Sequence, residues 1–309
     1  MDISLFFIVI LSHILFDFVF QNEFILKMRF PKSKSYIDNK LKEKTSLRIK
    51  ERLYKSLYSL SIKKRSIVGN VIHSTIHLIG IYIVSAMINL INGQAVYVPL
   101  FQVLLISISH FIVDELKSLL YLKDIKLIEN IWVFWLDQLL HLIFILLILS
   151  ICNNINLINM LREKILIYPN GFSLNEKLLI VFINISIATW GVGIFIKILM
   201  HHLSSNNNKT DFKIRNWSQN NKVINKDTLE EDAGAPNGGF IIGLLERTFI
   251  LVSIVINYPM MIGFILTIKS VARFKKLSND SFAEYFIIGT FLSFIPALLL
   301  GIIIRSLFF

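Results

Sequence analysis

Long apolar segments separated by short charged clusters constrain this chain more than any other feature. Each segment is close to the roughly 20 residues that a helix needs to cross the hydrocarbon core of a bilayer. Charged residues make up 17% of the chain, against about 25% in soluble domains. We therefore predict an all-α, polytopic transmembrane helical bundle with about 6–8 membrane segments. The segments lie at residues 3–20, 67–91, 99–121, 131–151, 174–200, 240–268 and 284–304.

The segment at 240–268 is interrupted by Asn257, Tyr258 and Pro259. Proline lacks the backbone N–H that a helix interior needs, so one straight span is not expected there. We predict a Pro-broken or re-entrant pair instead. That arrangement returns the basic residues after 268 to the same side as the other basic loops, as the positive-inside rule requires.

Lysine and arginine concentrate between the first two apolar segments, at residues 27–66. Basic loops stay on the cytoplasmic side, so this stretch and the polar segment 201–239 are predicted to be cytoplasmic and the N-terminus to lie outside. The basic stretch is either an amphipathic surface helix or a solvated loop. Four regions follow: a four-span bundle at 1–151, a loop and fifth span at 152–200, the linker at 201–239 and a C-terminal membrane region at 240–309.

The net charge of +11 reflects this topology, and no nucleic-acid partner is expected. Membrane lipids are the expected partners. The basic stretch is suited to anionic lipids or to a cytosolic protein.

Each of the first four apolar segments carries two ionisable residues, one helical turn apart. The spacing i, i+4 places both side chains on one helix face. A charged side chain inside a membrane costs about 2.5–3.5 kcal/mol, so such residues normally face the bundle interior and serve a function. The predicted topology places all four pairs at a similar depth in the cytoplasmic half of the bundle. The pairs are His13/Asp17, His73/His77, His110/Asp114 and Asp137/His141.

Imidazole and carboxylate are ligands for zinc, manganese or iron, and cysteine is not required. The eight groups exceed the needs of one tetrahedral ion. They could hold two ions, or one ion with an outer shell of His–Asp partners. We therefore predict a divalent metal cofactor with all eight residues as candidate ligands. A two-ion site would suit hydrolysis of a phosphoester by activated water.

Several polar residues lie on the same helix faces as the pairs. Asp17, Asp114 and Asp137 are also candidate catalytic residues, together with Lys117, which could neutralise a phosphate. Gln21 and Asn70 could orient a ligand or water. A second set in the C-terminal region could bind an anionic headgroup, or could simply anchor the helices at the interface. This set comprises Glu246, Arg247, Lys269, Arg273 and Glu284.

The pairs are also compatible with a structural polar network between helices, with a proton or cation pathway, and with bis-His haem ligation, which would leave the aspartates unexplained. Three functions follow. The leading hypothesis is a metal-dependent hydrolase acting on a lipid-linked or phosphorylated substrate at the cytoplasmic face. The alternatives are a transporter or cation-pathway component, and a non-catalytic membrane scaffold in stress response or phage defence.

Several ordered motifs resemble a bacterial multi-pass membrane family, domain of unknown function 3307. The resemblance implies a bacterial inner (plasma) membrane protein and supplies no activity. A fainter similarity to membrane-bound metal-dependent hydrolases is an analogy only. The motifs are His13-Ile-Leu-Phe-Asp17-Phe-Val-Phe-Gln21, Ser109-His110…Asp114…Lys117, Asp137-Gln138…His141, Gly243-Leu-Leu-Glu246-Arg247, Lys269-Ser270…Arg273-Phe274 and Glu284-Tyr285…Gly289-Thr290.

Overall fold

The computed structural model describes residues 3–31, 60–92, 96–123, 130–206 and 238–309. Every regular element among these residues is helical, which confirms the predicted all-α class. The chain forms two compact units, Met1–Ile180 and Val181–Phe309. Most of the basic stretch and of the linker at 201–239 lies outside the described residues.

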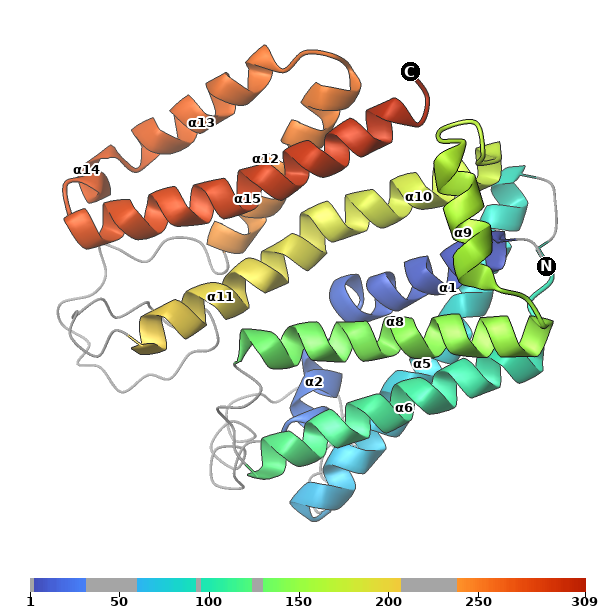
Figure 1. Ribbon diagram of the computed structural model, residues 1–309. Coiled ribbons are helices and arrows are strands. Elements are labelled where there is room, and N and C mark those ends of the chain that lie inside the picture. Colours follow the sequence, from blue (N-terminus) through green and yellow to red (C-terminus); the bar gives the residue numbers. More distant parts are fainter. Residues whose placement is uncertain (1–2, 32–59, 93–95, 124–129, 207–237) are drawn as a thin grey trace. The chain divides into compact units, whose positions relative to one another are not determined.

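The first unit contains the four segments that carry the His and Asp pairs. Its elements are α1 (Ser4–Ile14), the π-helix η1 (Leu15–Val19), α2 (Glu23–Arg29), α5 (Ile62–Asn92), α6 (Leu100–Lys123), α8 (Ile131–Asn153) and α9 (Leu157–Leu166), and α10 (Leu174–Ser186) leads out of it. Within this unit α1 contacts α5 and α8, and α6 packs between α5 and α8. These four helices therefore enclose a common interior (Figure 1).

The chain bends by 90° between Ser4–Val19 and Glu23–Arg29. The amide oxygen of Asn22 accepts a hydrogen bond of 3.0 Å from the backbone N–H of Phe24, so Asn22 caps the new helix. This bend brings α2 back against α5. The last residue of α2, Arg29, is 3% exposed and therefore lies inside the unit.

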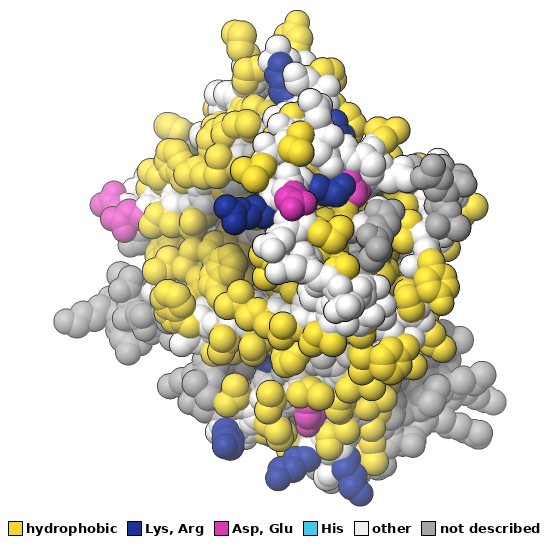
Figure 2. Space-filling view, turned by 45° about the vertical axis from the view of Figure 1, so that its right-hand side comes forward, with side chains coloured by type: hydrophobic (Ala, Val, Ile, Leu, Met, Phe, Trp, Pro, Cys, Tyr) yellow, Lys and Arg dark blue, Asp and Glu magenta, His cyan; other side chains and the backbone are white. Residues whose placement is uncertain are grey.

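The helices of the first unit bury the polar residues of the pairs together with an apolar core, and they expose many apolar side chains. On α5, His73 and His77 are buried, whereas Ile79 and Ile83 are 51% and 47% exposed. Hydrophobic side chains cover much of the surface seen in Figure 2, and the charged side chains lie in small groups. This distribution is the one expected for helices that face lipid.

The second unit confirms the predicted break near Pro259. Its elements after α10 are η2 (Ile187–Gly191), α11 (Val192–Asn206), α12 (Gly238–Val255), α13 (Met260–Ala272), α14 (Phe274–Leu277) and α15 (Asp280–Ser306). Asn257 has φ = 62°, a left-handed conformation that ends the helical path, and Pro259 precedes the first residue of α13.

Five helical stretches within the described residues are long and apolar enough to cross a membrane, or six if the bent N-terminal pair forms one span. Helix α13 is apolar but shorter. Helix α6 has 24 residues but is not among the five, because Asp114, Glu115 and Lys117 lie in its second half. The chain is thus a multi-pass membrane protein by helix length and composition.

Candidate metal centre

All four His/Asp pairs converge inside the first unit, as their spacing and expected depth predicted. Because neighbouring helices run in opposite directions, their side chains fall into layers. The four rings of one layer lie with neighbouring centroids as close as 3.9 Å, for His77 and His110, and 4.2 Å, for His110 and His141. That layer consists of His13, His77, His110 and His141. The next layer consists of Asp17, His73, Asp114 and Asp137.

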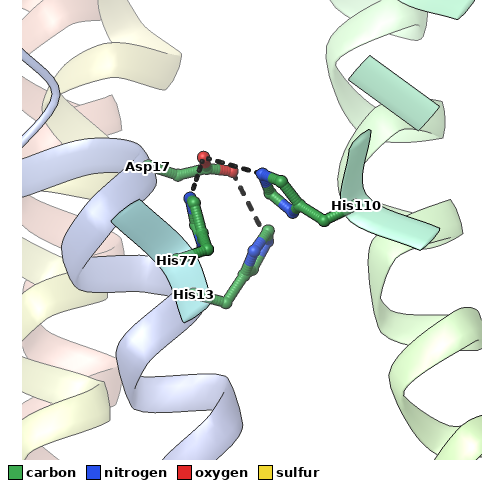
Figure 3. Close-up of side chains that lie close together, drawn as sticks. All are labelled: His13, Asp17, His77 and His110. Carbon is green, nitrogen blue, oxygen red and sulfur yellow. Dashed lines mark hydrogen bonds and ion pairs between the residues drawn. The ribbon is translucent and has the colours of Figure 1, made fainter. Parts of the chain in front are cut away.

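Figure 3 shows the carboxylate of Asp17 in contact with three histidine side chains. Its Oδ1 lies 2.9 Å from Nε2 of His73 and 3.1 Å from Nε2 of His77. Its Oδ2 lies 3.6 Å from Nε2 of His13. The π-helix η1 carries this residue, and π-bulges within helices are frequent at functional sites. From this π-helix the Asp17 carboxylate faces α5 and α6.

One set of four residues has the composition of a tetrahedral metal site. One ligand atom from each of His13, Asp17, His77 and His110 lies within 4.8 Å of all the others. Three imidazoles and one carboxylate are a ligand set that zinc and other divalent ions accept. We refer to these four residues as site A.

A second set, Asp114, Asp137 and His141, meets the same distance criterion, and we refer to it as site B. Sites A and B share no residue, and a third set, His73, His110 and Asp114, lies between them. The eight residues therefore form a continuous group of ligands with room for one or two ions.

Each carboxylate of site B has one oxygen paired with a cation. Asp114 Oδ1 lies 2.5 Å from Nη2 of Arg29, and Asp137 Oδ2 lies 2.6 Å from Nζ of Lys117. The other oxygen of each carboxylate is buried and makes no hydrogen bond within the described part of the chain. Each free oxygen faces imidazole: Asp114 Oδ2 lies 3.3 Å from His110 Nε2, and Asp137 Oδ1 lies 3.7 Å from His141 Nε2.

Nε2 of His13, His110 and His141 is likewise buried without a hydrogen bond among the described residues. Buried polar atoms are normally paired, and an unpaired one costs about 1–3 kcal/mol. Five such atoms lie in this one group: the three Nε2 atoms and the two free Asp oxygens. Each of these atoms offers a lone pair in the appropriate protonation state. A cation in site A would satisfy those of His13 and His110, and a cation in site B would satisfy those of Asp114, Asp137 and His141. The residues thus fit a metal ion.

Arg29 was not singled out from the sequence, because it lies within the basic stretch that is predicted to be either an amphipathic surface helix or a solvated loop. Its Nε donates a 3.0 Å hydrogen bond to Oδ1 of Asn70, whose Nδ2 donates to Glu115 and Ser118. With its amide oxygen turned towards the guanidinium, Gln21 accepts from Nη1 at 2.7 Å. Gln21 and Asn70, predicted to orient a ligand or water, therefore hold Arg29 against Asp114.

A cavity of about 10 Å³ adjoins the histidine layer, which is near the smallest volume that can hold one water. His13, His77, His110 and His141 line it on one side. The opposite lining is mostly aliphatic and lies one turn further along each helix: Val9, Ile81, Ile106 and Ile145. The ligands therefore border an apolar layer on that side.

The residues of the second predicted site lie in the second unit. Glu246 is 2.8 Å from Nζ of Lys269. Arg247 donates from Nε and Nη2 to the carbonyl oxygen of Thr189, which belongs to the π-helix η2, and from Nη1 to Ser293. Arg273 is half-buried and Glu284 is exposed. The two buried members, Glu246 and Arg247, therefore already have partners in the side chains of Lys269 and Ser293 and the Thr189 carbonyl. The predicted role of the set in substrate binding stays a prediction.

One family model matches part of the chain. Residues 56–168 match a family described as a protein of unknown function (DUF3307). The match confirms the resemblance seen in the motifs and spans α5, α6 and α8. It includes six of the eight cluster residues and excludes His13 and Asp17. No curated protein and no solved structure matches the chain.

Proposed function

We propose that this chain is a membrane-embedded, metal-dependent hydrolase that acts on a lipid-linked or phosphorylated substrate at the cytoplasmic face. The observation that carries the proposal is the group of five buried ligand atoms without hydrogen bonds among the described residues, three from imidazole and two from carboxylate. Imidazoles and carboxylates without cysteine suit a zinc, manganese or iron ion. Such an ion would activate a water molecule near neutral pH for attack on a phosphoester or similar group.

The remaining groups of the site fit hydrolysis. Site A offers four ligands from four helical elements, which can fix the position of one ion. Asp114 and Asp137 each keep one oxygen free to accept a proton from an attacking water. Lys117 and Arg29 lie at the same end of the cluster, where negative charge on a phosphoryl group would need neutralisation. The side chain of Lys117 is 19% exposed, so this end of the cluster is partly accessible.

A cation pathway is less well supported. Conducting paths need polar groups at successive depths. Next to the histidine layer, the cavity is lined mainly by the aliphatic side chains of Val9, Ile81, Ile106 and Ile145, and its polar lining besides the histidines is Ser107 and Ser109. An enclosed reaction site that opens on the Lys117 side agrees better with this arrangement.

Metal analysis of the purified full-length chain tests the proposal directly. We expect at least one divalent ion per chain by mass spectrometry of the metals, and phosphate release from a lipid phosphomonoester that a chelator abolishes. His77→Ala should lose both the ion and the activity. His201→Ala, a change of the same kind in the second unit, is the matched control. A chain without stoichiometric metal whose activity survives His77→Ala would refute the proposal.

The predicted setting completes the proposal. We place the chain in a bacterial inner membrane, with the basic stretch at the cytoplasmic face in contact with anionic lipids or a cytosolic protein.

A further inference from the structure

The two sites differ in how their carboxylates are neutralised. In site B, Asp114 pairs with Arg29 at 2.5 Å and Asp137 pairs with Lys117 at 2.6 Å. In site A, Asp17 lies only against imidazoles among the described residues. Among the described residues, the Asp17 carboxylate therefore has no Lys or Arg partner, whereas the Asp114 and Asp137 carboxylates have one each.

Charge must balance closely in this interior, because the interaction of unpaired charges is strong where water is excluded. In site A, the one carboxylate without a Lys or Arg partner would partly neutralise a divalent ion. Binding of this ion is therefore electrostatically favourable. A second divalent ion in site B would join two ion pairs that are already neutral. Among the described residues, Glu115 on α6 and the buried Arg65 on α5 also carry charge. Their charges are opposite, so they leave the sum of charges unchanged.

The arrangement of buried ligand atoms in site B is nevertheless suitable for binding an ion. Asp114 Oδ2, Asp137 Oδ1 and His141 Nε2 are buried and make no hydrogen bond within the described residues. Lys117 could turn away from Asp137 towards an incoming anion, because its side chain is 19% exposed. The Asp137 oxygen that it leaves would keep a 3.1 Å hydrogen bond from Nε2 of Gln138.

We infer that site A holds one divalent ion at rest and that site B takes a second ion only together with a dianionic phosphoryl group. The dianion brings the two negative charges that the second ion requires, and Lys117 contacts it. The inference rests on the proposed function and names its substrate class: a phosphomonoester, whose terminal group is a dianion. A phosphodiester carries a single negative charge and would not balance the second ion.

The test measures how many manganese ions bind to each chain. The full-length chain is stripped with a chelator, reloaded with Mn²⁺ and freed of excess metal, and manganese per chain is measured with and without inorganic phosphate. We expect one ion without phosphate and two with it, and the second should give the electron paramagnetic resonance signature of coupled Mn²⁺ ions. One ion in both conditions, or two in both, overturns the inference. A chain that binds no ion at all refutes the proposed function as well.

Lipid and soluble sources of the phosphoryl group can be separated in nanodiscs. Phosphatidic acid presents a phosphomonoester, and phosphatidylglycerol presents a phosphodiester as the control. A second ion with phosphatidic acid identifies a lipid source, whereas a second ion with free phosphate alone identifies a soluble one. A second ion with phosphatidylglycerol alone would contradict the charge balance.

Two variants test whether the charges at site B control binding of the second ion. Lys117→Met removes the cation from Asp137, so the second ion should bind more tightly without phosphate than it does in the wild type. Asp137→Asn should keep one ion and lose the phosphate-dependent second one. A Lys117→Met chain that binds no more manganese without phosphate than the wild type would overturn the role assigned to Lys117.

Discussion

Gly69 of α5 lies against the main chain of α2, and the contact leaves no room for a side chain. A Cβ atom at this position would lie 2.7 Å from the backbone nitrogen of Arg29 and 2.9 Å from the carbonyl carbon of Met28. These are main-chain atoms, which cannot rotate away as a side chain can. Gly69→Ala should therefore move α2 away from α5.

The size of the effect follows from the contact. The helices would have to separate by about 0.7 Å to bring the 2.7 Å approach to an ordinary 3.4 Å. Overpacking of this kind costs about 1–3 kcal/mol. Replacing glycine by alanine inside a helix returns about 1 kcal/mol through helix propensity. The free energy of unfolding should consequently fall by about 0–2 kcal/mol.

Gly263→Ala provides the matched control, because a Cβ there meets no atom within 4 Å. It should be more stable than the wild type by up to about 1 kcal/mol. Both variants are compared with the wild type by titration with sodium dodecyl sulfate in mixed micelles, followed by circular dichroism. Relative to this control, Gly69→Ala should lose about 1–3 kcal/mol.

The same displacement of α2 should also change the affinity for metal. Arg29 holds Asp114 at 2.5 Å, so a shift of α2 should disturb that carboxylate and weaken binding of the phosphate-dependent ion in site B. Gly263→Ala should leave metal affinity unchanged. If Gly69→Ala matches Gly263→Ala in both stability and metal affinity, the packing described for α2 and α5 is incorrect.

Three further substitutions separate the roles of the charged residues. Arg29→Gln leaves the carboxylate of Asp114 buried without its cation, and should destabilise the chain by about 3–5 kcal/mol in the same titration. Adding Asp114→Asn should restore much of this loss, and an equally unstable double variant would contradict the pairing. Asp17→Asn removes the carboxylate of site A and should weaken metal binding by more than the ~10–100-fold typical of residues outside the ligand shell. Calorimetric titration with Mn²⁺ measures it, and unchanged affinity would exclude Asp17 as a ligand. Arg247→Met deprives the Thr189 carbonyl of its donor and should cost about 1–3 kcal/mol. The metal content of this variant should stay at the wild-type level, and a loss of metal would show that the site depends on this residue.

Much of the architecture follows from residue order. Apolar length and charge clustering predicted an all-α membrane protein, and the Asn257 and Pro259 signals predicted the break between α12 and α13. Neither depends on distant contacts, because a backbone in lipid must satisfy its hydrogen bonds within each helix. The basic residues at 32–59 and the polar linker at 207–237 lie outside the described residues, so their predicted roles stay predictions.

For the site itself, the sequence determined which side chains could meet. A spacing of four residues fixes His13 with Asp17 and His110 with Asp114 on one face of each helix, whatever surrounds them. The cost of burying ionisable groups in lipid then turns those faces inward. Tertiary structure alone decided how these side chains pair. The 90° bend after Val19 returns Arg29 to Asp114, and the rotation of α6 against α8 brings Lys117 to Asp137. Such pairings depend on how whole helices pack, and helical periodicity carries no information about which face of one helix meets which face of another.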